Sequence, residues 1–309
     1  MKKIFLFVII SYLSQLAIAQ TATLSGHIKD KKNGEALIGA TCYFPDIRKG
    51  ITSNEYGYYS ITVPAGTNKI SFSYIGYETQ TITLDLNKNQ VLDILLADNN
   101  TELDAVTVVG TRKDRNVEST EMSMEKLPVK LVKKLPSFMG EVDVMKTITL
   151  LPGIQSGGEG SSGLYVRGGG PDENLLLLDE APVYNASHLL GFFSVFNSDA
   201  IKDIQVYKGG IPAEYGGKAS SVIDIRMKDG NSQHLSGQAG IGNISSRMTL
   251  EGPIIKDKWS FIISGRRTYA DVVGRMIGID ELKDNKLYFY DLNLKTNIEF
   301  SHKDRVYIS

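Results

Sequence analysis

The chain has 309 residues, and its 34 Lys and Arg nearly balance its 35 Asp and Glu, giving a formal net charge of −1 at pH 7. This balance gives no strong case for binding to nucleic acid or to an anionic surface, and we expect no nucleic-acid partner. The 30 Gly and 15 Tyr, with only 9 Pro, favour short strands and tight turns, and the length leaves room for two or three domains. The one cysteine, Cys42, cannot form an internal disulfide, and its neighbours Tyr43 and Phe44 predict an inert thiol in a buried strand.

The amino terminus has the pattern of a secretory signal peptide. Lys2 and Lys3 precede an apolar run over residues 4–18, and Ala-Ile-Ala at 17–19 fits the small-x-small cleavage site. A transmembrane anchor is the alternative, but Ser and Gln residues interrupt the apolar run. We therefore expect cleavage after Ala19. Since no long apolar helix follows in the sequence, membrane insertion would have to use β-strands.

Residues 20–98 alternate apolar and polar positions in short segments between glycine-containing turns. Several strands at this spacing predict a small β-sandwich. The expected strands are Thr23–Lys29, Ala40–Phe44, Ile51–Ser53, Tyr58–Val63, Lys69–Tyr74, Tyr77–Leu86 and Val91–Leu96. The sequence has no metal-ligand spacing such as His-Glu-x-x-His, and His27 stands alone on its strand. We expect no catalytic residue, no metal and no cofactor.

The next segment, residues 99–116, is a polar linker around one β-branched run, Leu103–Gly110. This run has two interpretations. It is the last strand of the sandwich, or it is a detachable strand that pairs with the sheet edge of another protein through main-chain hydrogen bonds.

Residues 117–232 mix a helix with strands and glycine turns. Apolar residues at three-residue spacing predict a helix over Ser137–Leu150, which Pro152 ends. The loop Gly168–Asn174 lacks the Gly-Lys-Ser/Thr ending of a phosphate-binding loop, and a strand rather than a helix follows it at Leu175–Leu178. Nucleotide binding is therefore not expected.

Residues 233–309 alternate in the way expected of membrane β-barrel strands. In Tyr290–Phe300, one face is mostly Tyr, Leu, Ile and Phe and the other carries Asp, Asn, Lys and Glu, which suits lipid on one side and a watery lumen on the other. A half-exposed soluble sheet gives the same alternation. At roughly ten residues a strand there is room for only four or five strands, so we expect a fragment or an early-terminated form of a longer chain.

Two stretches resemble known families. Ser25–Asp30, Gly34–Ala40, Asn54–Tyr59 and Tyr74–Glu78 are similar to the carboxypeptidase-regulatory-like domain, a non-catalytic, transthyretin-like sandwich. The block from Val166 to Asp229 resembles the plug domain of TonB-dependent outer-membrane receptors of the Bacteroidetes type. Its strongest motifs are Arg167–Asn174 and Lys208–Arg226. Asp179-Glu180 departs from the Asp-Gly that such relatives usually carry.

The resemblance implies a mainly β chain with an N-terminal transthyretin-like β-sandwich, an α+β plug domain and the first few strands of a transmembrane β-barrel. The implied boundaries are a signal peptide at 1–19, the sandwich at 20–98, a linker with a TonB box at 99–116, the plug at 117–232 and an incomplete barrel at 233–309. The TonB box would be Asp104, Ala105, Val106, Thr107, Val108 and Val109.

The same resemblance assigns roles to plug residues. Arg167 would help to lock the plug to the barrel through carboxylate partners. Tyr184, Asn185 and His188 are candidate ligand contacts because plug loops of this region rise toward the extracellular pocket. The alternative for the neighbouring phenylalanines is that they belong to the core of the plug.

The implied function is TonB-dependent, energised uptake of a scarce ligand across the outer membrane, without covalent chemistry. The expected partners are TonB, which adds a strand, outer-membrane lipid, an extracellular ligand, and a surface lipoprotein. A second interpretation is a secreted periplasmic binding module that does not transport. The sequence does not identify the ligand.

Overall fold

The computed structural model describes residues 20–99, 124–133, 142–158, 163–191, 193–276, 278, 285–301 and 304–309. The chain divides into two compact units, Met1–Glu102 and Leu103–Ser309, and each is described by itself. The TonB box predicted at Asp104–Val109 and the signal peptide predicted at 1–19 lie outside the described residues.

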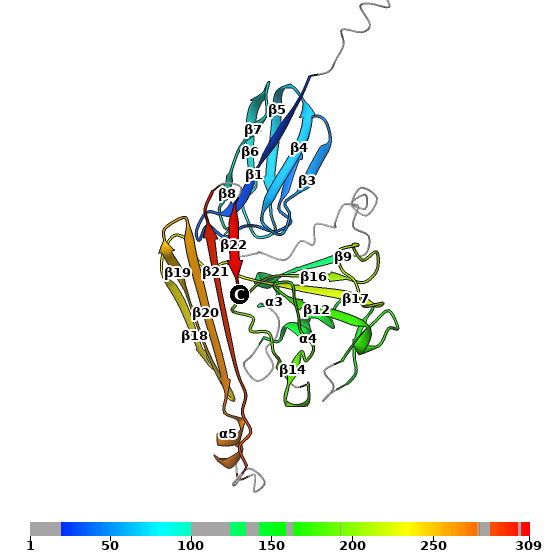
Figure 1. Ribbon diagram of the computed structural model, residues 1–309, viewed down its shortest axis with the longest axis vertical. Helices are drawn as coiled ribbons and strands as arrows, with labels where there is room; N and C mark the ends of the chain where they lie inside the picture. The colour runs from blue at the N-terminus through cyan, green and yellow to red at the C-terminus, as the bar shows by residue number, and fades with distance from the viewer. Residues whose placement is uncertain are drawn as a thin grey trace, which may run out of the picture. The chain divides into compact units, whose positions relative to one another are not determined.

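The first unit consists of two packed sheets (Figure 1). One sheet has the order β4-β1-β7, with β8 also pairing with β1, and the other has the order β3-β2-β5-β6. The strands are β1 (Thr21–Asp30), β2 (Thr41–Phe44), β3 (Lys49–Thr52), β4 (Tyr58–Pro64), β5 (Gly66–Ser73), β6 (Gln80–Leu86), β7 (Gln90–Val91) and β8 (Ile94–Leu96). This is the sandwich that the alternation predicted.

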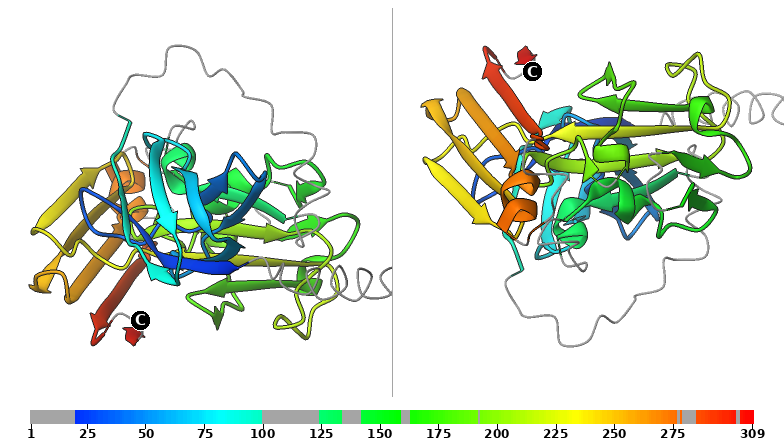
Figure 2. Two further views of the ribbon diagram at one scale, coloured as in Figure 1. Left: turned by 90° about the horizontal axis from the view of Figure 1, so that it is seen from above. Right: turned by 90° about the horizontal axis from the view of Figure 1, so that it is seen from below.

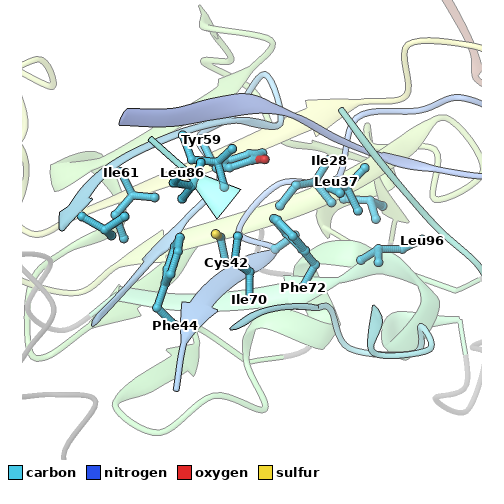
Figure 3. Packing of buried hydrophobic residues seen from close by; sticks show 14 of the residues in the cluster. Ile28, Leu37, Cys42, Phe44, Tyr59, Ile61, Ile70, Phe72, Leu86 and Leu96 are labelled. Atoms are coloured by element: carbon cyan, nitrogen blue, oxygen red, sulfur yellow. The ribbon is translucent and has the colours of Figure 1, made fainter. Parts of the chain in front are cut away.

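The inward residues of both sheets form one apolar core, shown in Figure 3. Cys42 lies in it, fully buried among Phe44, Tyr59 and Phe72, and burial raises the pKa of its thiol to about 12. At neutral pH the group is therefore a thiol and not the reactive thiolate, as the sequence predicted.

One predicted strand is split in two. We expected one strand over Val91–Leu96, but β7 ends at Val91 and β8 begins at Ile94. The backbone of Leu92 approaches Gly26 of β1 so closely that a Cβ on Gly26 would lie 1.9 Å from the Leu92 carbonyl oxygen. The side chain of Asp93 then accepts a hydrogen bond of 2.8 Å from the backbone N–H of His27. This contact between distant segments leaves no sign in the local alternation.

The second unit is built around a five-stranded sheet of order β13-β12-β17-β16-β9, here called the mixed sheet. β12 and β17 are parallel, and the other neighbours are antiparallel. Its strands are β9 (Met124–Pro128), β12 (Asn174–Leu178), β13 (Ala181–Pro182), β16 (Ile201–Tyr207) and β17 (Ser221–Met227). The surrounding elements are α3 (Val129–Val132), α4 (Val144–Ile148), β10 (Ile154–Ser156), β11 (Leu164–Val166), η1 (Pro171–Glu173), β14 (Ser187–His188), η2 (Leu189–Gly191) and β15 (Phe193–Ser194).

The two faces of the mixed sheet differ. Ile204, Val206, Ile223 and Ile225 belong to a core that also contains Val144 and Ile148 of α4, which explains the apolar spacing of that helix. Within the helix predicted at Ser137–Leu150, the described part is α4, and Asp143 caps it by accepting from the backbone N–H of Lys146 at 3.1 Å. Buried polar residues lie elsewhere on the sheet, among them Asp203 and Asp224.

An antiparallel meander follows the mixed sheet. It consists of β18 (Ser236–Ile241), β19 (Ser245–Ile255), β20 (Trp259–Thr268), β21 (Tyr290–Glu299) and β22 (Arg305–Ile308), paired in chain order, with α5 (Ala270–Met276) between β20 and β21. In both views of Figure 2 the yellow to red strands of the meander stand at one end of the green strands of the mixed sheet. Within the described residues, the helices fall short of the length and apolar character that crossing a membrane requires.

In β21 the apolar side chains are exposed and a charged side chain is buried, which is the reverse of an ordinary soluble sheet. Leu292 and Leu294 are 73% and 56% exposed, whereas Lys295, on the other face, is only 6% exposed. The polar face therefore packs on the protein and the apolar face lies outward. An ordinary half-exposed soluble sheet would instead hide its apolar side.

Candidate functional site: the junction of the mixed sheet and the meander

A buried lysine of the meander ends among acidic groups of the mixed sheet. The Nζ of Lys295 in β21 lies 3.1 Å from Oδ2 of Asp179 and 3.2 Å from Oδ1 of Asp229, and it donates to the carbonyl oxygen of Met227 at 3.2 Å. Lys202 of β16 reaches the other oxygen of Asp229 at 2.7 Å. We call Lys295, Lys202, Asp179 and Asp229 the Lys295 cluster.

The Lys295 cluster is electrically balanced, with two ammonium groups and two carboxylates. All four side chains are at most 10% exposed. Burial alone would raise the pKa of Asp229, but the ammonium groups of Lys202 and Lys295 outweigh burial and hold that pKa below its usual value. Buried charges persist when they are paired and hydrogen-bonded, and this cluster meets both conditions.

The turn that carries Asp179 has an unusual backbone. Asp179 and Glu180 both adopt positive φ, 46° and 70°, as the two central residues of a tight β12–β13 hairpin require. The side chain of Asp179 accepts the backbone N–H of Met227 at 2.9 Å, and Glu180 pairs with Arg226 at 2.8 Å. Glycine would adopt this conformation without strain, so the departure from Asp-Gly at Glu180 places a strained residue beside the Lys295 cluster.

A second group of contacts holds the β14–β15 hairpin. His188 Nε2 lies 2.6 Å from Oδ1 of Asp291 in β21, and its ring stacks on Phe289 with centroids 4.1 Å apart. Arg266 of β20 donates through Nε to the other oxygen of Asp291 at 3.0 Å and through Nη2 to the carbonyl oxygen of Ser194 at 2.6 Å. The buried guanidinium therefore bridges the meander and the hairpin.

A third group lies where β16 begins. One carboxylate oxygen of Asp199 lies 2.7 Å from Nζ of Lys133, and the other lies 2.7 Å from Nε of Arg247 in β19. Burial raises the pKa of the Asp199 carboxyl, but these two cations outweigh it, and the net shift is downward. Beside it, Asn197 donates to the Ser264 hydroxyl of β20 at 2.7 Å. The junction therefore contains both ion pairs and neutral hydrogen bonds.

The chain leaves the mixed sheet through a close backbone approach. Gly230 has φ of +85°, and a Cβ there would lie 2.4 Å from the carbonyl oxygen of Phe261 in β20. Next to it, the hydroxyl of Ser260 donates to the carbonyl oxygen of Asp229 at 2.7 Å. Only glycine fits this crossing.

The contacts of Asp179, Asp229 and Asp199 lie at one end of the mixed sheet, which we call the anchored end, and the β14–β15 hairpin belongs to the loop that leads into the start of β16 at this end. The anchored end comprises the end of β12, the end of β17 and the start of β16. At the opposite end, Arg167 follows β11 with φ of 49° and lines a cavity of about 400 Å³. Lys208 also lines this cavity, and its Nζ lies 3.2 Å from Glu125 and donates to the carbonyl oxygen of Pro152 at 3.0 Å. We call this the cavity end.

Two buried carboxyls lie within the mixed sheet. Asp203 of β16 and Asp224 of β17 are each 1% exposed, and burial raises the pKa of both. Asp224 contacts Arg226 at 2.9 Å and the hydroxyl of Tyr215 at 3.2 Å. Among the described residues, one oxygen of each carboxyl has no hydrogen-bond donor.

The predicted ligand contacts separate. Tyr184 is 96% exposed in the loop between β13 and β14, and Asn185 beside it is also exposed. His188 instead pairs with Asp291 in the junction. Phe193 and Phe196 are buried, in line with the alternative that these phenylalanines are core.

Several junction residues went unrecognised in the sequence. The alternation placed Asp291 and Lys295 on the polar face of one strand, which was the available signal. Arg266 is the cross-strand neighbour of Asp291 in the meander, so strand register alone pairs these two residues. No local signal marks Asp179 and Asp229 as the partners of Lys295, or Asp199 as that of Arg247, because those pairings depend on how two sheets meet. The cavity that Arg167 lines is compatible with the role predicted for it, and its partners in that role stay a prediction.

Two family models match the chain. The CarboxypepD_reg-like domain matches residues 24–108, and the TonB-dependent receptor plug domain matches residues 119–223. The first match extends into the β-branched run of the linker and ends at residue 108. The second covers most of the mixed sheet, ending within β17, and includes the Lys208–Gly217 turn.

Curated relatives agree with these models. TonB-dependent receptor P26 of Formosa agariphila is 28% identical over 227 residues, which are 70% of this chain and 22% of that one. The ferrienterobactin receptor of Escherichia coli K12 is 27% identical over 195 residues, 53% of this chain and 25% of that one. The chain thus spans about a fifth to a quarter of the length of these relatives.

Among solved structures, the siderophore receptor PirA of Acinetobacter baumannii is 22% identical, with a TM-score of 0.42 over 59% of this chain and 30% of that one. The sandwich and the mixed sheet follow one another along the chain in the order that the family models give. The chain is mainly β, it carries a CarboxypepD_reg-like domain followed by a plug domain, and it belongs to the TonB-dependent receptors, a family of receptors rather than enzymes.

Proposed function

We propose that this chain works as part of an outer-membrane receptor that takes up a scarce extracellular ligand with energy delivered through TonB. The observation that carries the proposal is the inverted meander, with Leu292 and Leu294 exposed and Lys295 buried against the plug. An outward apolar face suits the hydrocarbon of a bilayer, and a polar inner face suits a lumen that holds a plug. Family membership supports the same conclusion.

The proposed location has a direct test. The full chain, expressed with its amino-terminal segment, should sediment with outer membranes and resist extraction by carbonate at high pH. Release by osmotic shock would contradict the proposal and favour a periplasmic module. The two results differ because a strand with lipid-facing leucines cannot leave the bilayer without exposing them to water.

TonB is the proposed partner of the strand Asp104–Val109. Strand addition takes its affinity from main-chain hydrogen bonds, and proline removes one N–H donor and fixes φ. Val106→Pro and Val108→Pro should each weaken binding of the purified periplasmic domain of TonB at least about tenfold, because both lost bonds and distorted backbone oppose pairing. Val106→Thr keeps the backbone and should bind within about twofold. Unchanged binding by both proline variants would contradict the pairing.

Arg167 is proposed to lock the cavity end of the plug to the inner wall of the barrel. Arg167 lines a cavity of about 400 Å³ together with Lys208 and Glu173. A guanidinium binds carboxylates in a bidentate geometry, so carboxylates of the barrel are the partners that we propose for Arg167. In a receptor that contains this chain and a complete barrel, Arg167→Gln should let cells take up a bulky antibiotic that the outer membrane normally excludes. Arg167→Lys keeps the charge and should leak less, and equal exclusion in all three proteins would remove the lock role.

For ligand contact we propose Tyr184, with Asn185 beside it, as the exposed tip of a loop. His188 is proposed to position that loop, because it contacts Asp291 and Phe289. Once a ligand is found, Tyr184→Ala should weaken its binding, and His188→Ala should weaken it less while increasing hydrogen exchange of the β14–β15 hairpin.

A further inference from the structure

We propose that the Lys295 cluster is a fixed anchor that holds one end of the plug against the meander. When the plug rearranges, the cavity end moves and the anchored end stays attached to the meander. This inference rests on the proposed function, since it says which part of the plug yields when TonB pulls. It concerns residues for which the sequence motifs give no role.

Opening the Lys295 cluster carries a high cost. Lys295 and Asp229 are 7% and 9% exposed in their side chains, and separation of the plug from β21 would leave a cation on one surface and an excess carboxylate on the other. Taking one partner away from a buried ion pair destabilises a protein far more than replacing both partners by apolar residues does. The cluster therefore resists separation even though its charges sum to zero.

Several independent ties lie at the same end. The Lys295 cluster holds β12 and β17, Arg266 and Asp291 hold the β14–β15 hairpin, and Arg247 holds the start of β16 through Asp199. Each of these ties reaches a different strand of the meander or a different loop of the plug. All of them must break before this end separates, so we infer that it moves last.

Among the described contacts the cavity end is held more weakly, and the lock proposed for Arg167 would be the tie that yields there. The edge strand β9 begins at this end, where Met124 pairs with Tyr207 of β16. Lys208 ties β16 to Glu125 of β9, whose side chain is 45% exposed. An ion pair with so exposed a partner contributes little, so this end opens at a lower free-energy cost than the anchored end.

A charge-balance experiment tests the anchor. Hydrogen exchange of the purified full chain in detergent would follow the backbone N–H groups of Asp179, Met227 and Lys228 at the anchored end, and those of Arg167 and Ser220 at the cavity end. Lys295→Met leaves the cluster with one surplus negative charge, and Asp179→Asn leaves one surplus positive charge. Each should speed exchange at the anchored end at least about a hundredfold and leave the cavity end within about threefold.

The double variant Lys295→Met with Asp179→Asn restores neutrality through the remaining Lys202–Asp229 pair, and the amide oxygen introduced at position 179 can still accept the N–H of Met227. It should recover exchange to within about tenfold of the unaltered chain. Single variants that exchange like the unaltered chain, or a double variant as fast as the singles, would overturn the anchor. Neither result depends on TonB or on a ligand, so failure here leaves the receptor proposal standing.

A labelling experiment tests which end moves. With the buried Cys42 replaced by Ala, Ser264→Cys reports on the anchored end and Ser220→Cys on the cavity end. Cells with and without TonB would be treated with a membrane-permeant maleimide. We expect TonB to increase labelling of the thiol at position 220 at least about threefold and to leave the thiol at position 264 unlabelled. TonB-dependent labelling at 264, or none at 220, would overturn the proposal.

Discussion

The two ends of the plug's mixed sheet are built from similar side chains but in different surroundings. At the anchored end, Lys295 and Asp229 are buried and paired across two sheets, and the buried Arg266 pairs with Asp291 of its own sheet and donates to the carbonyl oxygen of Ser194. At the cavity end, Arg167 is exposed at the edge of a cavity of about 400 Å³. The number of charged side chains therefore does not by itself decide how firmly each end of the plug is held. The worth of an ion pair depends on how fully water has been removed from both partners.

The same contrast separates two kinds of motion. An end tied by several buried contacts opens with the global free energy of unfolding, whereas an end tied by few contacts opens locally. A receptor that must both exclude solutes and admit a ligand benefits from this division, because one end preserves the seal while the other responds to force.

The largest expected effect is the loss of a buried guanidinium. Arg266→Met leaves Asp291 buried with only His188 near it and removes the donor to the carbonyl oxygen of Ser194. We expect unfolding of the plug to become easier by about 3–5 kcal/mol. Arg167→Met at the cavity end is the matched control and should cost less than about 1 kcal/mol. Urea unfolding in detergent, followed by hydrogen exchange of plug peptides, measures both.

Equal losses in these two variants would remove the distinction between the ends. A large loss in Arg167→Met alone would reverse it. The pair is well matched because the same chemical change is made in both, from a guanidinium to an uncharged thioether.

A backbone test at the same two ends should give a somewhat smaller effect. Gly230→Ala at the anchored end would place its Cβ 2.4 Å from the carbonyl oxygen of Phe261 at φ of +85°, so backbone must shift. We expect a loss of about 2–4 kcal/mol. Gly216→Ala in the β16–β17 turn finds no atom within 4 Å of its Cβ and should change stability by less than about 0.5 kcal/mol. A tolerated Gly230→Ala would show that the backbone crossing can widen at little cost.

Much of the fold was accessible from the sequence because it follows from local periodicity. The two-residue alternation predicted the sandwich strands and β21, and the apolar spacing around Val144 and Ile148 placed a helix where α4 lies. The plug motifs identified the family. The break between β7 and β8 was missed because it depends on contacts with β1, far away in the chain, as the separation of 66 residues between His27 and Asp93 illustrates.

Only part of the candidate site could be predicted from the sequence. Alternation in β21 identified Asp291 and Lys295 as a pair on one face, but nothing local indicates that Asp179 and Asp229 meet Lys295. His188 was predicted as a ligand contact and that role stays a prediction, while its pairing with Asp291 was not foreseen because a histidine in a loop carries no mark of the surface it will face. Pairing between sheets is a property of the folded chain, and the sequence contains it only through the whole structure.

The two acidic residues Asp203 and Asp199 give a pH-dependent comparison with opposite signs. Burial raises the pKa of Asp203 in the folded state above its unfolded value of about 3.9, so the free energy of unfolding falls as pH rises from about 4 through the folded pKa. Asp203→Asn removes this penalty and should stabilise the plug by about 1–2 kcal/mol at pH 8, with little effect near pH 4. Lys133 and Arg247 lower the pKa of Asp199, so its contribution is present above about pH 4 and is lost at lower pH.

Asp199→Asn should therefore destabilise the plug at pH 8, and less so at pH 4, which is the reverse of Asp203→Asn. Urea titrations of both variants, each at pH 4 and at pH 8, measure the two effects. If Asp203→Asn destabilised the plug at pH 8, the Asp203 carboxylate would have to be paired, against the finding that one of its oxygens has no donor among the described residues.

The smallest expected effect concerns backbone strain, which occurs at both ends. Glu180 at the anchored end and Arg167 at the cavity end have φ of 70° and 49°, a region that glycine occupies at lower cost. Glu180→Gly should relieve about 1 kcal/mol of strain and lose the pair with Arg226, which contributes less than that because the Glu180 side chain is 61% exposed. The net result should be a stabilisation of at most about 1 kcal/mol. Arg167→Gly should relieve similar strain, so the difference between the two variants reports on what each side chain contributes at its own end. A clear destabilisation by Glu180→Gly would mean that its pair with Arg226 belongs to the anchor.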